Sequence, residues 1–214
     1  MKNLFSTSIG KKFAMAISAI FLMIFLLQHF IINITSVFSE DIFNMLSHFM
    51  GTNPLVQFIL QPILIAGVLF HFIMGFYLEI QNRKAAKYEY QKEKGSANST
   101  WMSRNMITSG LVILAFLVLH FIDFWVPEMN YKYIEFLPED PNRYYEELVH
   151  KFENPLRVAV YCLSFVLLGL HLLHGFTSSL RSMGTNKSYV SSAKTAGIVY
   201  SIGCLLYTSP SPRD

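Results

Sequence analysis

Four long, uninterrupted stretches of apolar residues dominate the pattern of the chain. They run over 13–38, 55–80, 105–126 and 156–180, and a fifth begins near Tyr189. Each of the first four exceeds the roughly 20 residues that a helix needs to cross a bilayer. Strands are not expected, because such runs lack the two-residue alternation of a half-buried strand. The pattern predicts an all-α membrane protein, a five-transmembrane-helix bundle whose fifth helix is truncated here.

Shorter signals refine this outline. Pro54 and Pro155 stand where the second and fourth helices would start, a position that tolerates proline. Pro62 lies inside the second stretch and predicts a kink there. Residues 41–50 mix apolar and polar side chains in the manner of a short amphipathic helix that lies in the membrane interface.

The composition agrees with a membrane protein. Hydrophobic residues make up 52% of the chain and charged residues 14%, against about 25% charged residues in soluble domains. A soluble enzyme, a disordered chain and a nucleic-acid-binding arm are therefore not expected. The chain has 2 cysteines, which excludes a disulfide scaffold, a four-thiolate zinc site and covalent haem attachment through C-x-x-C-H.

The distribution of basic residues sets the orientation. Of the 17 Lys and Arg residues, 12 fall on the side of the N-terminus and 4 on the other side. Because the more basic side of a membrane protein faces the cytoplasm, we expect a cytoplasmic N-terminus and an external segment, 127–155, that is acidic and rich in tyrosine. We expect a multi-pass protein of the bacterial inner (cytoplasmic) membrane.

Residues 204–214 have the sequence that one reading frame of a transposase-type sequencing adapter would encode. We interpret residues 1–203 as one transmembrane domain and expect residues 204–214 not to belong to the natural protein.

Histidines carry the chemical signal, because ionisable residues inside a membrane are costly and usually functional. The first three helices each hold one, His29, His71 and His120, and the fourth holds His171 and His174. At a rise of about 1.5 Å per residue, His29 and His120 lie about 24–26 Å from the nearest basic residue of the inner side. By the same rise, His71 and His171 lie about 15–18 Å from it.

Two histidine pairs at matched depths predict two metal macrocycles stacked across the membrane, because helix bundles build cofactor sites from facing side chains. Gly75 and Gly175 each follow a histidine of the inner pair by four residues, on the same helix face, and leave room for a porphyrin edge. Asn33 and Phe124 occupy the matching places in the outer pair. His174 is an alternative to His171 as the ligand in the fourth helix.

At these residues the chain resembles the single-chain, di-haem cytochrome b subunit of succinate:quinone oxidoreductases (succinate dehydrogenase and fumarate reductase). The marks of the resemblance are FLLQH at 25–29, SHFM at 47–50, Phe70-His71 with Gly75, His120, and His171 with Gly175. The resemblance implies five transmembrane helices and two b haems, the outer ligated by His29 and His120 and the inner by His71 and His171.

The resemblance also implies partners. An FAD-containing flavoprotein subunit carries out the succinate or fumarate chemistry, and an iron–sulfur subunit connects it to the membrane anchor. The anchor itself catalyses no succinate chemistry and exchanges electrons with quinone, usually menaquinone. Candidate groups for proton exchange with the quinone are Glu40, Asp41 and His48, although their positions near the outer end favour solvated loop residues over such a role. Candidate partners of the inner haem propionates are Lys11, Lys12, Trp101, Arg104 and Arg181, and the Lys and Arg residues among them are equally explained as the ordinary positive charge of the cytoplasmic side.

Two alternatives remain. In the first, the chain is a cytochrome b subunit of another membrane redox complex, such as a hydrogenase or formate dehydrogenase. In the second, it is a proton-coupled transporter without haem, and its histidines form a relay. A transporter should also hold carboxylates that face a cavity within the membrane. Glu79 and Asp123 are the only acidic residues in the apolar stretches, and both lie near helix ends.

Overall fold

The computed structural model describes residues 7–89, 105–185 and 195. The described part is helical, and no strand occurs in it. In chain order the elements are α1 (Ser8–Phe38), α2 (Glu40–Thr52), the π-helical turn η2 (Val56–Leu60), α3 (Gln61–Glu89), α5 (Met106–His120), the π-helical turn η3 (Phe121–Trp125), α6 (Val126–Tyr133), α7 (Arg143–Phe152) and α8 (Pro155–Ser182).

The four predicted spans are confirmed. Helices long and apolar enough to cross a membrane cover Ser8–Phe38, Val56–Lys84, Met106–Tyr133 and Pro155–Ser182. Large apolar side chains stand exposed along them, such as Ile24, Phe58 and Leu163, as expected for surfaces that face lipid. The fold is an all-α membrane bundle, whereas the predicted fifth span and residues 204–214 lie outside the described residues.

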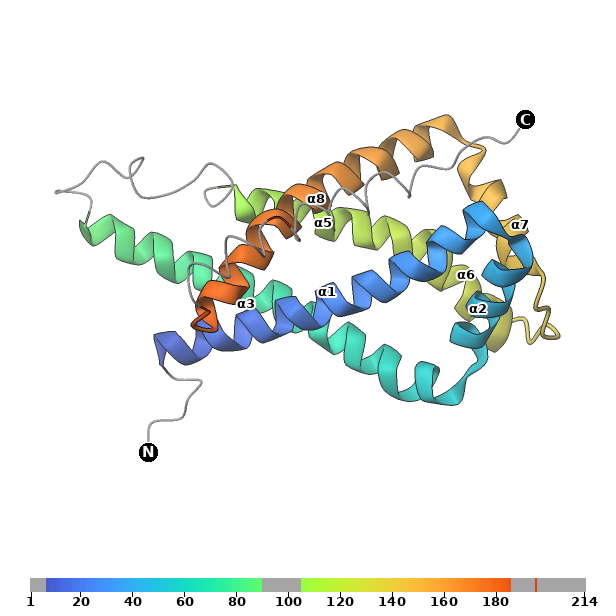
Figure 1. Cartoon of the computed structure of the whole chain (residues 1–214), viewed down its shortest axis with the longest axis horizontal. Helices are drawn as coiled ribbons and strands as arrows, with labels where there is room; N and C mark the ends of the chain where they lie inside the picture. Colours follow the sequence, from blue (N-terminus) through green and yellow to red (C-terminus); the bar gives the residue numbers. More distant parts are fainter. Residues whose placement is uncertain (1–6, 90–104, 186–194, 196–214) are drawn as a thin grey trace.

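The long helices alternate in direction and form a four-cornered bundle (Figure 1). Helix α1 packs along α3 and α8, and α5 packs along α8 and contacts α3. Helices α1 and α5 therefore occupy opposite corners, as do α3 and α8. This arrangement decides which side chains can meet across the interior.

Short polar residues begin the helices by satisfying backbone N–H groups that have no partner inside the helix. The side chain of Thr7 accepts a hydrogen bond from the N–H of Gly10 at 3.0 Å. Asn154 accepts from the first turn of α8, which opens with Pro155 as predicted. Ser39 both ends α1 and begins α2, so the chain turns sharply between these helices.

Two π-helical turns interrupt the regular hydrogen bonding of the spans. The first, η2, ends two residues before Pro62, the position where the sequence predicts a kink. The second, η3, begins directly after His120. A π turn shifts the direction of the residues that follow it, and here it accompanies the burial of Asp123, which is 2% exposed.

Helices α2, α6 and α7 gather at the end of the bundle away from the N-terminus (Figure 1). The amphipathic helix predicted at 41–50 is confirmed as α2, which packs against α1 and α7. Segment 127–155, expected only as an external acidic connection, forms α6 and α7. Its acidic residue Glu128 pairs with both Lys132 and Arg143, which offsets its charge and ties the two helices together.

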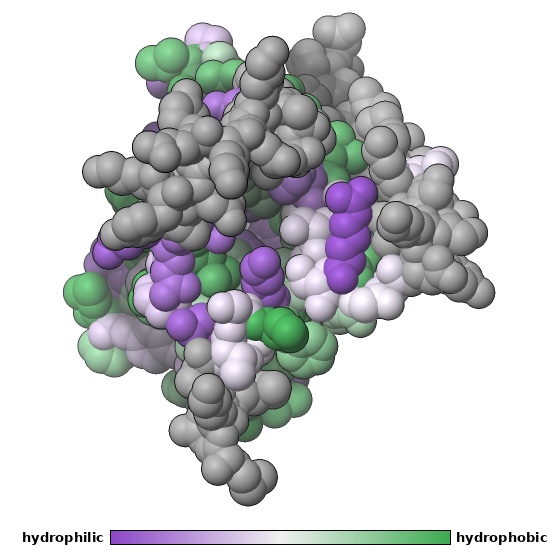
Figure 2. All heavy atoms as spheres, turned by 90° about the vertical axis from the view of Figure 1, so that its left-hand side faces the viewer, coloured by the Kyte–Doolittle hydropathy of each residue, from purple (hydrophilic) through white to green (hydrophobic). Residues whose placement is uncertain are grey.

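The opposite end of the bundle, where α1 begins and α8 ends, carries basic side chains. Lys11 and Lys12 lie on α1, Arg83 and Lys84 on α3, and Arg181 on α8. Figure 2 looks onto this end and shows hydrophilic side chains standing among apolar ones. The described basic residues thus gather at the end for which the sequence predicts the cytoplasmic face.

Candidate functional site

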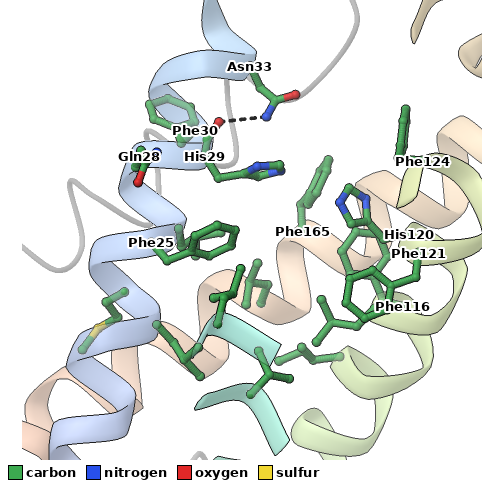
Figure 3. Close-up of a pocket in the computed structure, with 18 of the residues that line it drawn as sticks. Phe25, Gln28, His29, Phe30, Asn33, Phe116, His120, Phe121, Phe124 and Phe165 are labelled. Atoms are coloured by element: carbon green, nitrogen blue, oxygen red, sulfur yellow. Dashed lines mark hydrogen bonds between the residues drawn. The ribbon is translucent and has the colours of Figure 1, made fainter. Parts of the chain in front are cut away.

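The outer histidine pair spans the bundle from opposite corners. His29 comes from α1 and His120 from α5, and their ring centroids lie 5.7 Å apart with the ring planes at 90°. Figure 3 shows both imidazoles turned into the same interior space. The structure therefore brings together the two residues that the sequence pairs by depth.

Aromatic rings surround the outer pair. Phe25 stacks on His29 with ring centroids 5.7 Å apart. Phe116 and Phe124 lie one turn before and after His120, at 6.0 and 5.1 Å from its ring. Phe25 opens the FLLQH stretch that marks the resemblance, whereas Phe116 was not identified from the sequence, although its spacing of four residues from His120 on the same helix was a usable signal.

The inner histidine pair uses the other two corners. His71 comes from α3 and His171 from α8, and both residues line the same interior space. Each ring also contacts a serine of a neighbouring helix. Nδ1 of His71 lies 3.1 Å from Oγ of Ser18 on α1, and Nδ1 of His171 lies 3.1 Å from Oγ of Ser109 on α5. Neither serine was identified from the sequence alone.

These contacts bear on the choice between the two histidines of α8. It is His171, not His174, whose Nδ1 lies within hydrogen-bond distance of Oγ of Ser109. His174 lies one turn further along α8 and also borders the interior cavity. The arrangement favours His171 as the partner of His71 and leaves His174 beside it.

Both glycines of the inner pair border the same interior space. A Cβ atom on Gly75 would lie 3.5 Å from Cε of Met15, and one on Gly175 would lie 3.7 Å from Cε of Met106. These are ordinary van der Waals distances to the ends of flexible side chains. The glycines thus leave a gap beside each inner histidine that methionine tips now border.

A cavity of about 1570 Å³ runs through the bundle and is bordered by all five membrane histidines. Pockets for small molecules usually have about 300–1,000 Å³. The cavity is therefore large enough for more than one sizeable ligand, and it reaches both the outer and the inner histidine pairs.

The residues fit a macrocyclic metal cofactor. Two nitrogens that bind one metal ion from opposite sides lie about 4 Å apart, since each bond is about 2 Å, and the centroids of their imidazole rings then lie about 6 Å apart. The outer ring centroids lie 5.7 Å apart. Nδ1 of His120 is buried and has no hydrogen-bond partner among the described residues. Within those residues no group of three or more His, Cys, Asp or Glu side chains could hold a metal ion. Each histidine pair offers two nitrogen donors to a metal ion, and a porphyrin would supply the four others.

A polar triad built around the buried carboxylate of Asp123 adjoins the outer pair. The hydroxyl of Tyr161 donates a hydrogen bond of 2.9 Å to Asp123, and Nε of Arg157 lies 3.2 Å from the same carboxylate oxygen. Tyr161 also packs against the ring of His120 at 6.3 Å. The carboxylate is thus already paired with a cation and a hydroxyl group.

The candidates for proton exchange with a quinone lie on α2. Glu40 and Asp41 are exposed in its first turn, where acidic groups favour the helix dipole. His48 packs against the ring of Tyr144 and approaches Glu139 to 3.9 Å. His48 also borders a small polar cavity of about 230 Å³. Glu40 and Asp41 border neither this cavity nor the large interior one.

The candidates for propionate partners are spread over the basic end. Lys11 donates a hydrogen bond of 2.7 Å to the hydroxyl of Tyr77. Lys12 and Arg181 are exposed to solvent, and Trp101 and Arg104 lie outside the described residues. The structure does not single out any one of them.

Burial and charge shift two pKa values in the external polar cluster. Burial raises the pKa of Tyr144 to about 12, with the negative charge of Glu128 acting in the same direction. Burial alone would lower the pKa of Arg143, but hydrogen bonds to Glu128 and Glu147 raise it overall. Arg143 therefore stays charged and holds the two carboxylates together.

Comparison with protein families, with curated proteins and with solved structures finds no match for this chain.

Proposed function

We propose that this chain is the haem-carrying membrane anchor of a succinate:quinone oxidoreductase, which passes electrons between an iron–sulfur subunit and membrane quinone. The observation that carries the proposal is the pairing of His29 with His120 across the bundle interior. A second pair, His71 and His171, repeats the arrangement on the other diagonal.

The bundle explains why histidines at these places would share a ligand. Neighbouring helices pack directly, so their facing side chains touch each other and leave little space between them. Helices α1 and α5 stand at opposite corners, as do α3 and α8, and the cavity lies between them. A flat ligand placed in that cavity would meet one imidazole from each side.

A haem held by two imidazoles has no open coordination position and passes single electrons. The chain's own residues would hold and orient it. His29 and His120 supply the donors nearer the end where α2 and α7 gather, and His71 and His171 supply those nearer the basic end. The aromatic rings of Phe25 and Phe116 would exclude water from the outer pair.

The proposed partners follow from the resemblance and from the basic end of the bundle. A flavoprotein subunit with FAD and an iron–sulfur subunit would dock at that end, on the cytoplasmic side of the bacterial inner membrane. Quinone, menaquinone in the usual form of this family, would exchange electrons and protons with the chain within the membrane. The chain would carry out no succinate chemistry itself.

A proton-coupled transporter is less well supported. A relay through the membrane needs carboxylates that gain and lose protons in a cavity. Asp123 instead accepts a hydrogen bond from Tyr161 and is paired with Arg157, and Glu79 forms an ion pair with Arg83 at the end of its span.

Replacement of single histidines tests the proposal. His29→Ala or His120→Ala should remove one haem, and His71→Ala or His171→Ala the other, while each variant keeps the remaining haem. His150→Ala is the matched control, because His150 is 80% exposed on α7. An FAD-containing subunit that copurifies supports the succinate complex, whereas copurification of a hydrogenase or formate dehydrogenase subunit would assign the chain to another redox complex.

A further inference from the structure

We propose that Ser18 and Ser109 are positioning residues that fix the tautomer of the two inner histidines and present Nε2 of each ring to a metal. This inference rests on the proposed function. It starts from two hydrogen-bond chains that have the same form on different helices.

The first chain runs through Ser18. Its hydroxyl lies 2.8 Å from the carbonyl oxygen of Met15 and 3.1 Å from Nδ1 of His71. A hydroxyl has one hydrogen to donate, and a carbonyl oxygen can only accept. The hydrogen of Ser18 therefore goes to Met15, and the hydroxyl oxygen accepts the N–H of the imidazole.

The second chain repeats this on α5 and α8. Oγ of Ser109 lies 2.9 Å from the carbonyl oxygen of Met106 and 3.1 Å from Nδ1 of His171. In both rings the proton is thus held on Nδ1. A neutral imidazole carries one proton, so Nε2 keeps a free lone pair, which is the form that binds a metal.

The sequence carries the same device twice. His29 follows Ser18 by eleven residues, and His120 follows Ser109 by eleven. Eleven residues make about three helical turns, so each serine lies on the same face as the outer histidine of its helix. One face of α1 thus bears the outer histidine His29 and also Ser18, which contacts His71 of α3. One face of α5 likewise bears His120 and Ser109, which contacts His171 of α8.

The methionines complete the repeat. Met15 precedes Ser18 by three residues and Met106 precedes Ser109 by three. Their Cε atoms border the positions where a Cβ of Gly75 and of Gly175 would stand. Each inner histidine is therefore met by the same group of residues, a serine on Nδ1 and a methionine beside the glycine one turn away.

The outer pair lacks this support on at least one side, because Nδ1 of His120 is buried and finds no partner among the residues described. Hydrogen bonding of the second ring nitrogen orients a metal-bound imidazole and raises its basicity. A more basic ligand stabilises the oxidised metal and lowers its reduction potential. The serines should therefore tune the inner site and leave the outer one unaffected.

The test uses the full-length protein with 15N-labelled histidine, studied in its reduced state. We expect the ring protons of His71 and His171 on Nδ1. Ser18→Ala and Ser109→Ala should each raise the midpoint potential of the inner haem, with the haem content and the outer potential unchanged. Ser18→Thr, which keeps a hydroxyl, should restore the native potential.

Ser36→Ala is the matched control, because Ser36 also donates to the carbonyl three residues before it, that of Asn33, at 2.7 Å. Ring protons on Nε2 of His71 and His171 would overturn the inference. So would midpoint potentials of the inner haem in both serine variants that equal the potential in the Ser36 variant. In either case the haem content would still support the proposed function. Wild-type protein without haem would overturn the proposed function, and the ring signals would still report the tautomer. Where an alanine variant does not fold, the ring signals of the wild type decide.

Discussion

Tyr161 of α8 donates a hydrogen bond of 2.9 Å to the carboxylate of Asp123, and both residues are 2% exposed. The π-helical turn that begins after His120 contains Asp123. Asp123 lies inside the third span, Met106–Tyr133, and not near its end as the sequence suggested. The bond therefore links the third span to the fourth directly beside the outer histidine pair. We regard this link as the structural anchor of the outer site.

Removal of this link should destabilise the bundle. Tyr161→Phe should cost about 1 kcal/mol, the usual net contribution of one hydrogen bond. Asp123→Ala should cost more, about 1–3 kcal/mol, because it leaves the hydroxyl of Tyr161 buried without a partner. Thermal unfolding in detergent measures both. Tyr133→Phe, which removes an exposed hydrogen bond to Gln57, is the control, and equal losses in the two Tyr→Phe variants would contradict the anchor.

Gly67 marks a close approach between α1 and α3. A Cβ atom there would lie 2.7 Å from Cε1 of Phe21, closer than packed atoms allow. Gly67→Ala should therefore force the ring of Phe21 to move and cost about 1–3 kcal/mol. In Gly110→Ala the new Cβ would lie 3.9 Å from its nearest neighbour, His171, so the unfolding temperature should hardly change. An unfolding temperature that falls as far in the second variant as in the first would show that the close contact is unimportant.

Substitutions at the inner glycines should separate folding from cofactor binding. An alanine at Gly75 or Gly175 would make ordinary contacts of 3.5 and 3.7 Å with methionine tips, so we expect both alanine variants to fold. A leucine at either position would project into the cavity and should lower the haem content from two to one per chain. Haem quantification measures this, and full haem content in both leucine variants would remove the glycines from the site.

The external cluster should make stability depend on alkaline pH. The pKa of Tyr144 is raised from its ordinary value of 10.0 to about 12 in the folded chain. Between these two values the unfolded chain loses the phenol proton and the folded chain keeps it. The contribution of the protonated Tyr144 phenol to the stability of the folded chain is thus complete below pH 10 and is lost as the pH rises towards 12.

The free energy of unfolding, measured from pH 9 to 12, checks this loss of stability, because that range covers both pKa values of Tyr144. Tyr144→Phe should flatten the decline in stability over that range. Tyr145→Phe, in which the neighbouring ring packs on Phe43, keeps the same number of tyrosines as the first variant. A decline that is equally steep in both variants would contradict the assignment to Tyr144.

Much of the architecture could be predicted because it depends on local signals. Long apolar runs determine spans, so the predicted 13–38 and 156–180 lie within the observed Ser8–Phe38 and Pro155–Ser182. Depth along a helix is a simple function of residue number, and for this reason the pairing of His29 with His120 followed from counting. The amphipathic pattern of 41–50 likewise predicted α2.

Other features could not be predicted because they depend on which helices become neighbours. Ser18 and Ser109 contact histidines 53 and 62 residues away, and an isolated serine in an apolar run has no distinctive pattern. Both π-helical turns end two residues before a proline, Pro62 after η2 and Pro127 after η3, but Pro127 was expected only as the start of the external segment. Helix α7 contains so many charged residues that it was expected only as part of an external acidic segment.

The central claim is that the two histidine pairs hold two b-type haems, and quantification of haem in the purified full-length protein tests it most directly. A reduced-minus-oxidised spectrum together with a haem assay gives the type and the number per chain. The account predicts two b-type haems. A folded, membrane-inserted protein that contains no haem would contradict it.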